Sequence, residues 1–270
     1  MAREDFATGF SGVDRTSDPR SFVDYLDTTS ALESMQAMKR RTFTLLEVKE
    51  GHHLLDVGCG LGADVRALAQ LVGPTGRAVG VDSSETMIME ARRRAEGSDL
   101  PVEYRVGDAR RLDFPDHTFD GCRAERIFVH LDDPRQALAE MVRVARSGGR
   151  IVVLDGDWET LVVDAEDRAV TRKLLNFFCD SVRSGWVGRQ LPALFHEARL
   201  TDIGIIADTF LMTDLSLADQ TAELRATVER AQAAGVVSAA EGAAWLGQLE
   251  KAGQTGRFFS AVTLFGVVTL

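Results

Sequence analysis

Short apolar runs alternate with amphipathic stretches between residues 53 and 154. Runs of this length, closed by glycine or an acidic residue, are typical of buried strands, and apolar residues at three- and four-residue spacing are typical of helices. The strands are predicted at 53–57, 78–82, 102–106, 119–124 and 151–154. The helices between them are predicted near 65–72, 87–94 and 134–145. Strand, helix and strand in succession predict right-handed crossovers and a doubly wound α/β sheet of Rossmann-like type.

The two ends of the chain differ from this regular middle. Residues 1–30 are polar and predict a mobile segment, whereas 31–46 carry apolar residues at helical spacing. After residue 154 the pattern becomes mixed. Helices are predicted at 167–182, 192–198, 218–234 and 238–251, and strands at 203–206 and 259–268. We expect a lid or helical segment at 1–46 and a catalytic domain at 47–270, with a cap insertion at about 156–190.

Composition narrows the range of partners. The chain has 270 residues, 45% of them hydrophobic, with 31 Lys and Arg against 41 Asp and Glu, for a formal charge of −10. This acidic balance argues against nucleic acid, because affinity for phosphates comes largely from basic residues. No stretch is long and apolar enough to indicate a signal or a membrane span. The three cysteines lie far apart in sequence and His, Cys, Asp and Glu show no ligand spacing, so we expect a cytoplasmic protein without a metal, either a monomer or a homodimer.

A glycine-rich turn follows the first predicted strand. The run 54–62 reads Leu-Leu-Asp-Val-Gly-Cys-Gly-Leu-Gly, and the next two strands end at Asp82 and Asp108. Ligands of open α/β sheets bind beyond the carboxyl ends of the strands. Glycines allow the backbone to turn tightly there. Repeated carboxylates suit hydroxyl and amino donors better than phosphates.

Five segments in order resemble the motifs of class I S-adenosylmethionine-dependent methyltransferases. The resemblance covers roughly residues 40–155 and is strongest to the branch similar to ubiquinone- and menaquinone-biosynthesis methyltransferases. The segments are 54–62, 80–82, 107–109, 114–120 and 148–150. The resemblance implies a seven-stranded, mostly parallel sheet whose last strand is antiparallel, with a helical cap.

The resemblance also implies where S-adenosylmethionine would bind. Asp82 would accept the ribose hydroxyls, Met87 would pack on the adenine, and Asp108 with the Ala109 amide would meet its polar edge. The loop glycines would admit the methionine portion near Asp56. Carbonyls around Ala124 would complete the ammonium site, and two N-terminal residues would form a lid. The predicted cofactor-binding residues are Tyr25, Gln36, Asp56, Gly58, Gly60, Gly62, Asp82, Ser83, Met87, Asp108, Ala109, Ala124 and Glu125.

Two other functions remain open from the residues alone. Gly58, Gly60 and Ala63 also satisfy the pattern G-x-G-x-x-A of an NAD-dependent oxidoreductase, with Asp82 at a distance that suits a ribose. Asp56 argues against it, since a carboxylate before the glycines would repel a pyrophosphate, and Asp108 has no role in a dinucleotide site. The third possibility is a catalytically silent protein that binds the cofactor.

The candidate catalytic residues are His130 and Asp155, which follow the fourth and fifth strands. A carboxylate that orients an imidazole could remove a proton from an acceptor. The alternative is structural, with His130 bonding loop backbone and Asp155 capping a strand. Arg123, Glu125 and Arg126 either form local salt bridges or bind a polar acceptor. We expect transfer of a methyl group to a small organic metabolite, with oxygen favoured over nitrogen or carbon.

Aromatic residues after the fifth strand offer a candidate acceptor pocket. Trp158 and Trp186 flank this region, and Phe177, Phe178 and Phe195 lie between or beyond them. Large rings provide the apolar surface that small-molecule sites use. Helical spacing of the three Phe favours packing in the core instead.

Overall fold

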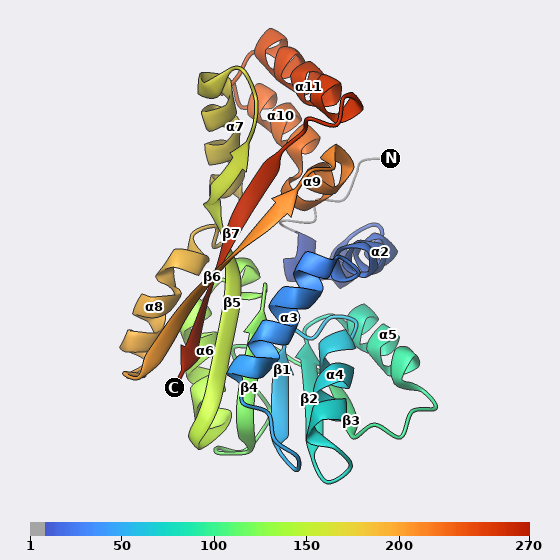
Figure 1. Cartoon of the computed structure of the whole chain (residues 1–270), viewed down its shortest axis with the longest axis vertical. Coiled ribbons are helices and arrows are strands. Elements are labelled where there is room, and N and C mark those ends of the chain that lie inside the picture. The colour runs from blue at the N-terminus through green and yellow to red at the C-terminus, as the bar shows by residue number, and fades with distance from the viewer. Residues whose placement is uncertain (1–8) are drawn as a thin grey trace.

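A seven-stranded sheet forms the centre of the molecule in the computed structural model, which describes residues 9–270 (Figure 1). The strand order is β3-β2-β1-β4-β5-β7-β6, and β7 is antiparallel to both of its neighbours. The strands are β1 (His53–Val57), β2 (Arg77–Asp82), β3 (Val102–Val106), β4 (Phe119–Glu125), β5 (Ala145–Val163), β6 (Ile203–Met212) and β7 (Ser260–Thr269). The predicted fold class is confirmed. The part of the predicted N-terminal segment at 1–8 lies outside the described residues.

Helices connect and cover these strands. They are η1 (Phe10–Arg15), α2 (Pro19–Ser30), α3 (Glu33–Leu45), α4 (Ala63–Val72), α5 (Glu85–Ala95), η2 (Phe128–His130), α6 (Pro134–Val144), α7 (Arg168–Ser181), α8 (Val187–Glu197), α9 (Leu215–Ala222), α10 (Leu224–Ala233) and α11 (Ala239–Gln254). The start predicted for α6 is confirmed, because Asp133 accepts a hydrogen bond from the Gln136 amide at 3.0 Å and Pro134 occupies the first turn.

Apolar residues in succession send their side chains to opposite faces of the sheet. On β1, Leu54 packs with Val65 and Leu68 of α4, whereas Leu55 packs with the core around Leu138 of α6. Burying each of these side chains contributes about 1.5–3 kcal/mol. Because both faces of such a strand are buried, its sequence is a continuous apolar run, and this run is what predicted the strand.

The long strands β5, β6 and β7 carry a second group of helices. Figure 1 shows α7, α9, α10 and α11 gathered beyond one end of the sheet, where β5 and β7 continue as a paired ribbon. We call this group, with the strand ends that it covers, the upper lobe. Helix α8 instead packs on β5 and β7 within the main sheet. Residues 156–190 thus divide between the end of β5, helix α7 and the start of α8.

Three local predictions were wrong. Within the segment predicted to be mobile, residues 10–15 and 19–30 form η1 and α2, because Phe22 is fully buried and anchors them. The helix predicted at 218–234 breaks at Glu223, whose φ of 48° ends α9 and begins α10. The strands predicted at 151–154 and 203–206 are longer in the structure, because β5 also pairs with β4 before residue 151 and with β7 after residue 154, and β6 pairs with β7 along its whole length.

Two observations concern the setting of the protein. None of the helices within residues 9–270 has the length and apolar character needed to cross a bilayer. Cys59, Cys122 and Cys179 are all buried with free thiols. Burial raises the pKa of the Cys179 thiol to about 11, which keeps it protonated and unreactive at neutral pH.

Candidate active site

A cavity of about 350 Å³ lies at the carboxyl ends of the central parallel strands. Eleven of the fifteen predicted site residues line it: Tyr25, Gly58, Gly60, Asp82, Ser83, Met87, Asp108, Ala109, Glu125, His130 and Asp155. The other four, Gln36, Asp56, Gly62 and Ala124, are not among the residues that line it. The volume is within the range of small-molecule sites.

The glycine loop requires glycine for reasons of packing as well as conformation. Gly58, Gly60 and Gly62 have φ of 73°, 49° and 69°, a region that other residues rarely adopt. A Cβ on Gly58 would lie 2.1 Å from the Ile127 side chain, and one on Gly62 would lie 2.5 Å from Tyr104. Gly62 therefore supports the loop from behind, while Gly58 and Gly60 face the cavity.

Asp82 joins the glycine loop to the start of α5. Its carboxylate accepts hydrogen bonds from the Gly60 amide at 2.9 Å and from the Ser84 amide at 3.0 Å, one on each oxygen. Burial raises the pKa of Asp82, and these backbone hydrogen bonds oppose the rise. Each oxygen keeps lone pairs for a further donor. The side chain can thus accept two hydroxyl groups from the cavity.

Asp108 is held by a neighbouring arginine. Arg110 donates to it from Nε at 3.0 Å and from Nη2 at 2.7 Å, one bond to each oxygen. These charge-assisted bonds lower the pKa of Asp108. The pair is exposed, so an amino donor from a ligand would share the carboxylate with Arg110 or displace it. Met87 forms part of the same wall and is buried, at 2% exposure.

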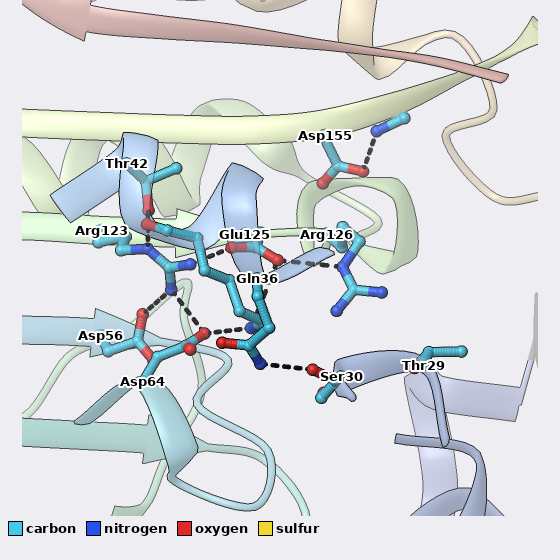
Figure 2. Close-up of polar contacts among 12 residues, drawn as sticks. Thr29, Ser30, Gln36, Thr42, Asp56, Asp64, Arg123, Glu125, Arg126 and Asp155 are labelled. Atoms are coloured by element: carbon cyan, nitrogen blue, oxygen red, sulfur yellow. Dashed lines mark hydrogen bonds and ion pairs between the residues drawn. The ribbon is translucent and has the colours of Figure 1, made fainter. Parts of the chain in front are cut away.

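Asp56 is the counter-ion of a buried arginine. Arg123 Nη1 lies 2.7 Å from its Oδ1 and 3.2 Å from Asp64 Oδ2, while Arg123 Nε donates to Thr42 Oγ1 at 2.7 Å (Figure 2). The remaining nitrogen, Nη2, pairs with Glu125. Of the two readings of Arg123 left open by the sequence, local salt bridges are confirmed.

Lys39 completes this buried cluster and reaches the cavity. Its Nζ lies 2.5 Å from Asp64 and 3.5 Å from Glu125 Oε1. Burial would raise the pKa of Asp64, but the charges of Arg123 and Lys39 lower it to about 2. Burial outweighs Arg123 at Asp56, whose pKa is raised to about 6. The carboxylate of Glu125 belongs to this cluster and also lines the cavity.

The N-terminal segment closes one side of the cavity. Asp14 of η1 accepts hydrogen bonds from the Glu85 amide at 2.8 Å and the Thr86 amide at 3.1 Å, and so caps α5. Asp27 of α2 forms two hydrogen bonds with Arg94, at 2.6 and 2.8 Å. We call these two contacts the latch. Each contact joins segments that are far apart in sequence. The sequence alone therefore offered no sign of either contact beyond the presence of acidic and basic residues.

Aromatic rings of the N-terminal segment lie against the candidate base. The Phe10 ring is 5.5 Å from the His130 ring and 5.8 Å from the Tyr25 ring, centre to centre. Burial raises the pKa of Tyr25. Gln36 does not face the cavity, but its side chain donates to the Ser30 carbonyl and joins α2 to α3 (Figure 2).

Asp155 holds the backbone of the turn that precedes His130. Its Oδ2 accepts from the Val129 amide at 3.2 Å and its Oδ1 from the Gly156 amide at 2.8 Å. The side chain is 1% exposed, and this burial raises its pKa to about 7 against the effect of the backbone bonds. A carboxyl group with such a pKa can take up or release a proton near neutral pH.

The upper lobe supplies the apolar wall beyond Asp155. Trp158, Phe210, Val262 and Leu264 line the cavity there. Of the other aromatic residues proposed for an acceptor pocket, Trp186 is 46% exposed. Phe178 and Phe195 are buried in the core. Sequence analysis missed Phe210, Val262 and Leu264, because strand pairing through β7 brings them to the site from the end of the chain.

The residues present fit an S-adenosyl compound. The lining of the cavity combines the carboxylates of Asp82 and Asp108, which can accept further hydrogen bonds, with the small glycine loop and the buried carboxylate of Glu125. A dinucleotide would instead bring a pyrophosphate to the glycine loop, in front of the carboxylates of Asp56 and Asp64.

Comparison with known proteins agrees with this geometry. Residues 55–153 match the methyltransferase domain family. The chain is 39% identical over 248 residues to an uncharacterized 37.1 kDa protein in transposon TN4556 of Streptomyces fradiae, covering 91% of this chain and 70% of that protein. It is 31% identical over 203 residues to a demethylmenaquinone methyltransferase of Bacillus mycoides, covering 69% of this chain and 86% of that protein.

A solved structure shares the fold. An S-adenosylmethionine-dependent methyltransferase from Aquifex aeolicus aligns with a TM-score of 0.52 and 18% identity, covering 91% of this chain and 97% of that one. The family match, the relatives and the shared fold agree with one another. The chain belongs to the class I S-adenosylmethionine-dependent methyltransferases, and S-adenosylmethionine is its cofactor.

Proposed function

We propose that the protein methylates a small organic acceptor, with oxygen favoured as the receiving atom. The observation that carries this proposal is that two kinds of residue line one cavity. We assign the carboxylates and the glycine loop to a first part, for the cofactor, and the apolar side chains with Asp155 to a second part, for the acceptor. When bound, S-adenosylmethionine supplies a methyl group already activated on a sulfonium.

We propose the following roles for the residues of the first part. Asp82 accepts the ribose hydroxyls and Met87 packs on the adenine. The adenine amino group donates to Asp108, which it shares with Arg110. Glu125 rather than Asp56 balances the ammonium group, because Glu125 lines the cavity and Asp56 does not. Lys39 lines the same region and can attract the carboxylate of the methionine portion.

The second part would hold the acceptor. Asp155, with its pKa near neutrality, is placed to remove a proton from a hydroxyl group, and His130 lines the same space. Because the transferred methyl is already activated, the chain contributes mainly by aligning the acceptor and removing its proton. The name of the Bacillus mycoides relative gives demethylmenaquinone as its acceptor, which supports an organic acceptor for this chain.

Binding and turnover test the proposal separately. Calorimetry with S-adenosylmethionine, S-adenosylhomocysteine and NAD should give binding isotherms for the first two only. Binding of NAD alone would favour the alternative function, an NAD-dependent oxidoreductase. Transfer of radiolabelled methyl to a panel of phenols, enols, amines and carboxylic acids should favour oxygen acceptors. Cofactor binding without transfer to any of them would favour the silent protein. His130→Ala should keep cofactor binding and lower turnover if the imidazole takes part.

A further inference from the structure

Arg126 is the first residue after β4 and has an unusual backbone conformation. Its φ is 56°, in the left-handed region that costs a residue with a side chain about 1 kcal/mol or more. The Arg126 amide donates to the Leu154 carbonyl at 2.8 Å, which extends the pairing of β4 with β5 and holds this conformation. Strain of this kind persists where the surrounding structure enforces it, and here it directs the side chain into the cavity.

The guanidinium group of Arg126 is only lightly engaged. Its Nε lies 3.3 Å from Glu125 Oε1, and within residues 9–270 its two terminal nitrogens have no hydrogen-bond partner. Figure 2 shows both nitrogens pointing away from Glu125 and from the buried cluster. Arg123, three residues earlier, uses all three guanidinium nitrogens on Thr42, Asp56, Asp64 and Glu125. Arg126 thus retains the paired donors that bind a carboxylate or a similar anion.

Arg126 lies between Glu125 of the cofactor part of the cavity and Asp155 of the acceptor part. Figure 2 places it beside Asp155, on the side away from Asp56 and Asp64. Tyr25, Arg126 and Asp155 line the same cavity, and the positive charge of Arg126 lowers the pKa of both Asp155 and Tyr25, which burial raises. The walls around this part are the apolar side chains of the upper lobe, where a charge is poorly screened and interacts strongly.

We infer that Arg126 binds an anionic oxygen of the acceptor, and that the acceptor class is a largely apolar, ring-sized molecule carrying a carboxylate or an ionisable hydroxyl. This inference rests on the proposed function and adds the charge of the acceptor to it. An apolar body matches Trp158, Phe210 and Leu264, and the anionic oxygen supplies the partner that the terminal nitrogens lack. Arg126 is then an acceptor-binding residue that selects acidic acceptors over neutral ones of the same shape.

A matched pair of ligands tests the charge requirement. With the protein saturated by S-adenosylhomocysteine at pH 7.5, calorimetry would compare 2-naphthoate with 2-naphthamide, which has nearly the same shape and no charge. Wild-type protein should bind 2-naphthoate about tenfold more tightly. Arg126→Gln should remove that preference, and Arg126→Lys should restore part of it. Arg92→Gln is the control, since Arg92 lies outside the cavity and its removal causes the same loss of net charge.

The outcomes separate this inference from the proposed function. Equal affinity of wild-type protein for the two ligands, no binding of either, or an undiminished preference in Arg126→Gln would overturn it. A large loss of S-adenosylhomocysteine affinity in Arg126→Gln would also overturn it, because Arg126 would then hold the cofactor. In turnover, Arg126→Gln should raise the KM for acidic acceptors at least tenfold and leave the KM for S-adenosylmethionine unchanged. Failure of the proposed function would appear instead as loss of cofactor binding or of all turnover in wild-type protein.

Discussion

Arg123 and Asp56 are paired residues on neighbouring parallel strands, β4 and β1, and their side chains meet at 2.7 Å inside the protein. The same guanidinium contacts Asp64 and Glu125. Three carboxylates thus converge on one arginine with Lys39 beside them. Without these cations, the carboxylates behind the glycine loop would repel one another in a region with little water.

Arg123→Met should destabilise the protein by about 3–5 kcal/mol, because it leaves buried carboxylates without a partner. The effect should depend on pH. Asp56, whose pKa is already raised to about 6, can be protonated below that value and escape the penalty. Urea unfolding should therefore show a larger loss at pH 8 than at pH 5.

The matched control is Arg146→Met, which removes an exposed arginine that pairs with Asp120. It should cost less than about 1 kcal/mol at either pH. In the double variant Arg123→Met, Asp56→Asn, part of the lost stability should return. Equal losses at Arg123 and Arg146 would show that the buried cluster contributes little.

Asp82→Ala should weaken binding of S-adenosylhomocysteine about tenfold or more. It removes two acceptor oxygens for the ligand and the hydrogen bonds that hold the Gly60 and Ser84 amides. Calorimetry would measure the affinity, with Asp99→Ala, an exposed aspartate far along the same βα unit, as the control. Unchanged affinity in Asp82→Ala would remove this residue from the cofactor site.

Asp14→Ala should loosen the latch. Loss of a helix cap costs about 1 kcal/mol, and the segment that covers the cavity would open more often. Stopped-flow measurements should show S-adenosylhomocysteine leaving about fivefold faster. Ser238→Ala removes the cap of α11, which is remote from the cavity, and should lower stability similarly with no change in the dissociation rate. Equal dissociation rates in both variants would rule out a covering role for η1.

Asp155 should give activity a pH dependence near neutrality. Burial raises its pKa to about 7, so the carboxylate form needed to take a proton grows as pH rises through 7, and kcat/KM should rise with it. Asp155→Asn cannot take up a proton, and its single oxygen can accept from the Val129 amide or the Gly156 amide but not from both, because these amides bond to different carboxylate oxygens. It should lower turnover by about 10²-fold or more and abolish this rise, with cofactor affinity unchanged.

The contribution of Asp155 to folding stability should fall as pH rises, whereas its contribution to activity should increase. The folded-state pKa of Asp155 lies above the unfolded value of about 3.9, so the unfolded chain loses its proton first, and stability falls as pH rises from about 4 to about 7. Asp155→Asn should remove that part of the fall. Identical pH profiles of stability and activity in wild type and variant would contradict both expectations.

Local sequence patterns predicted the parallel half of the fold and most of the cavity. The strand-ending residues Gly58, Asp82 and Asp108 could be placed because each element of a βα unit is specified by nearby residues. Asp56 was misleading, since its position before the glycines gave no sign that Arg123 would stand beside it. That pairing depends on the register of β1 with β4, which the pattern of either strand alone leaves open.

The upper lobe shows a second limit of sequence reasoning. Phe210 and Val262 read as ordinary strand residues, and their place in the cavity follows from the pairing of β6 with β7 across a separation of some fifty residues. The break at Glu223 was hidden because a glutamate rarely adopts a positive φ, and its ion pair with Arg230 is formed only after folding.

Because β5 and β7 run as paired strands from the sheet into the upper lobe, that lobe is fastened by backbone hydrogen bonds and has little freedom to swing. Molecules that enter or leave the cavity would then pass on the opposite side, where apolar packing around Phe22 and the carboxylates of Asp14 and Asp27 hold the amino-terminal segment. The ion pair of Asp27 with Arg94 weakens with dissolved salt far more than strand pairing does. The rates at which ligands enter and leave the cavity should therefore depend on ionic strength, whereas the pairing of β5 with β7 should not.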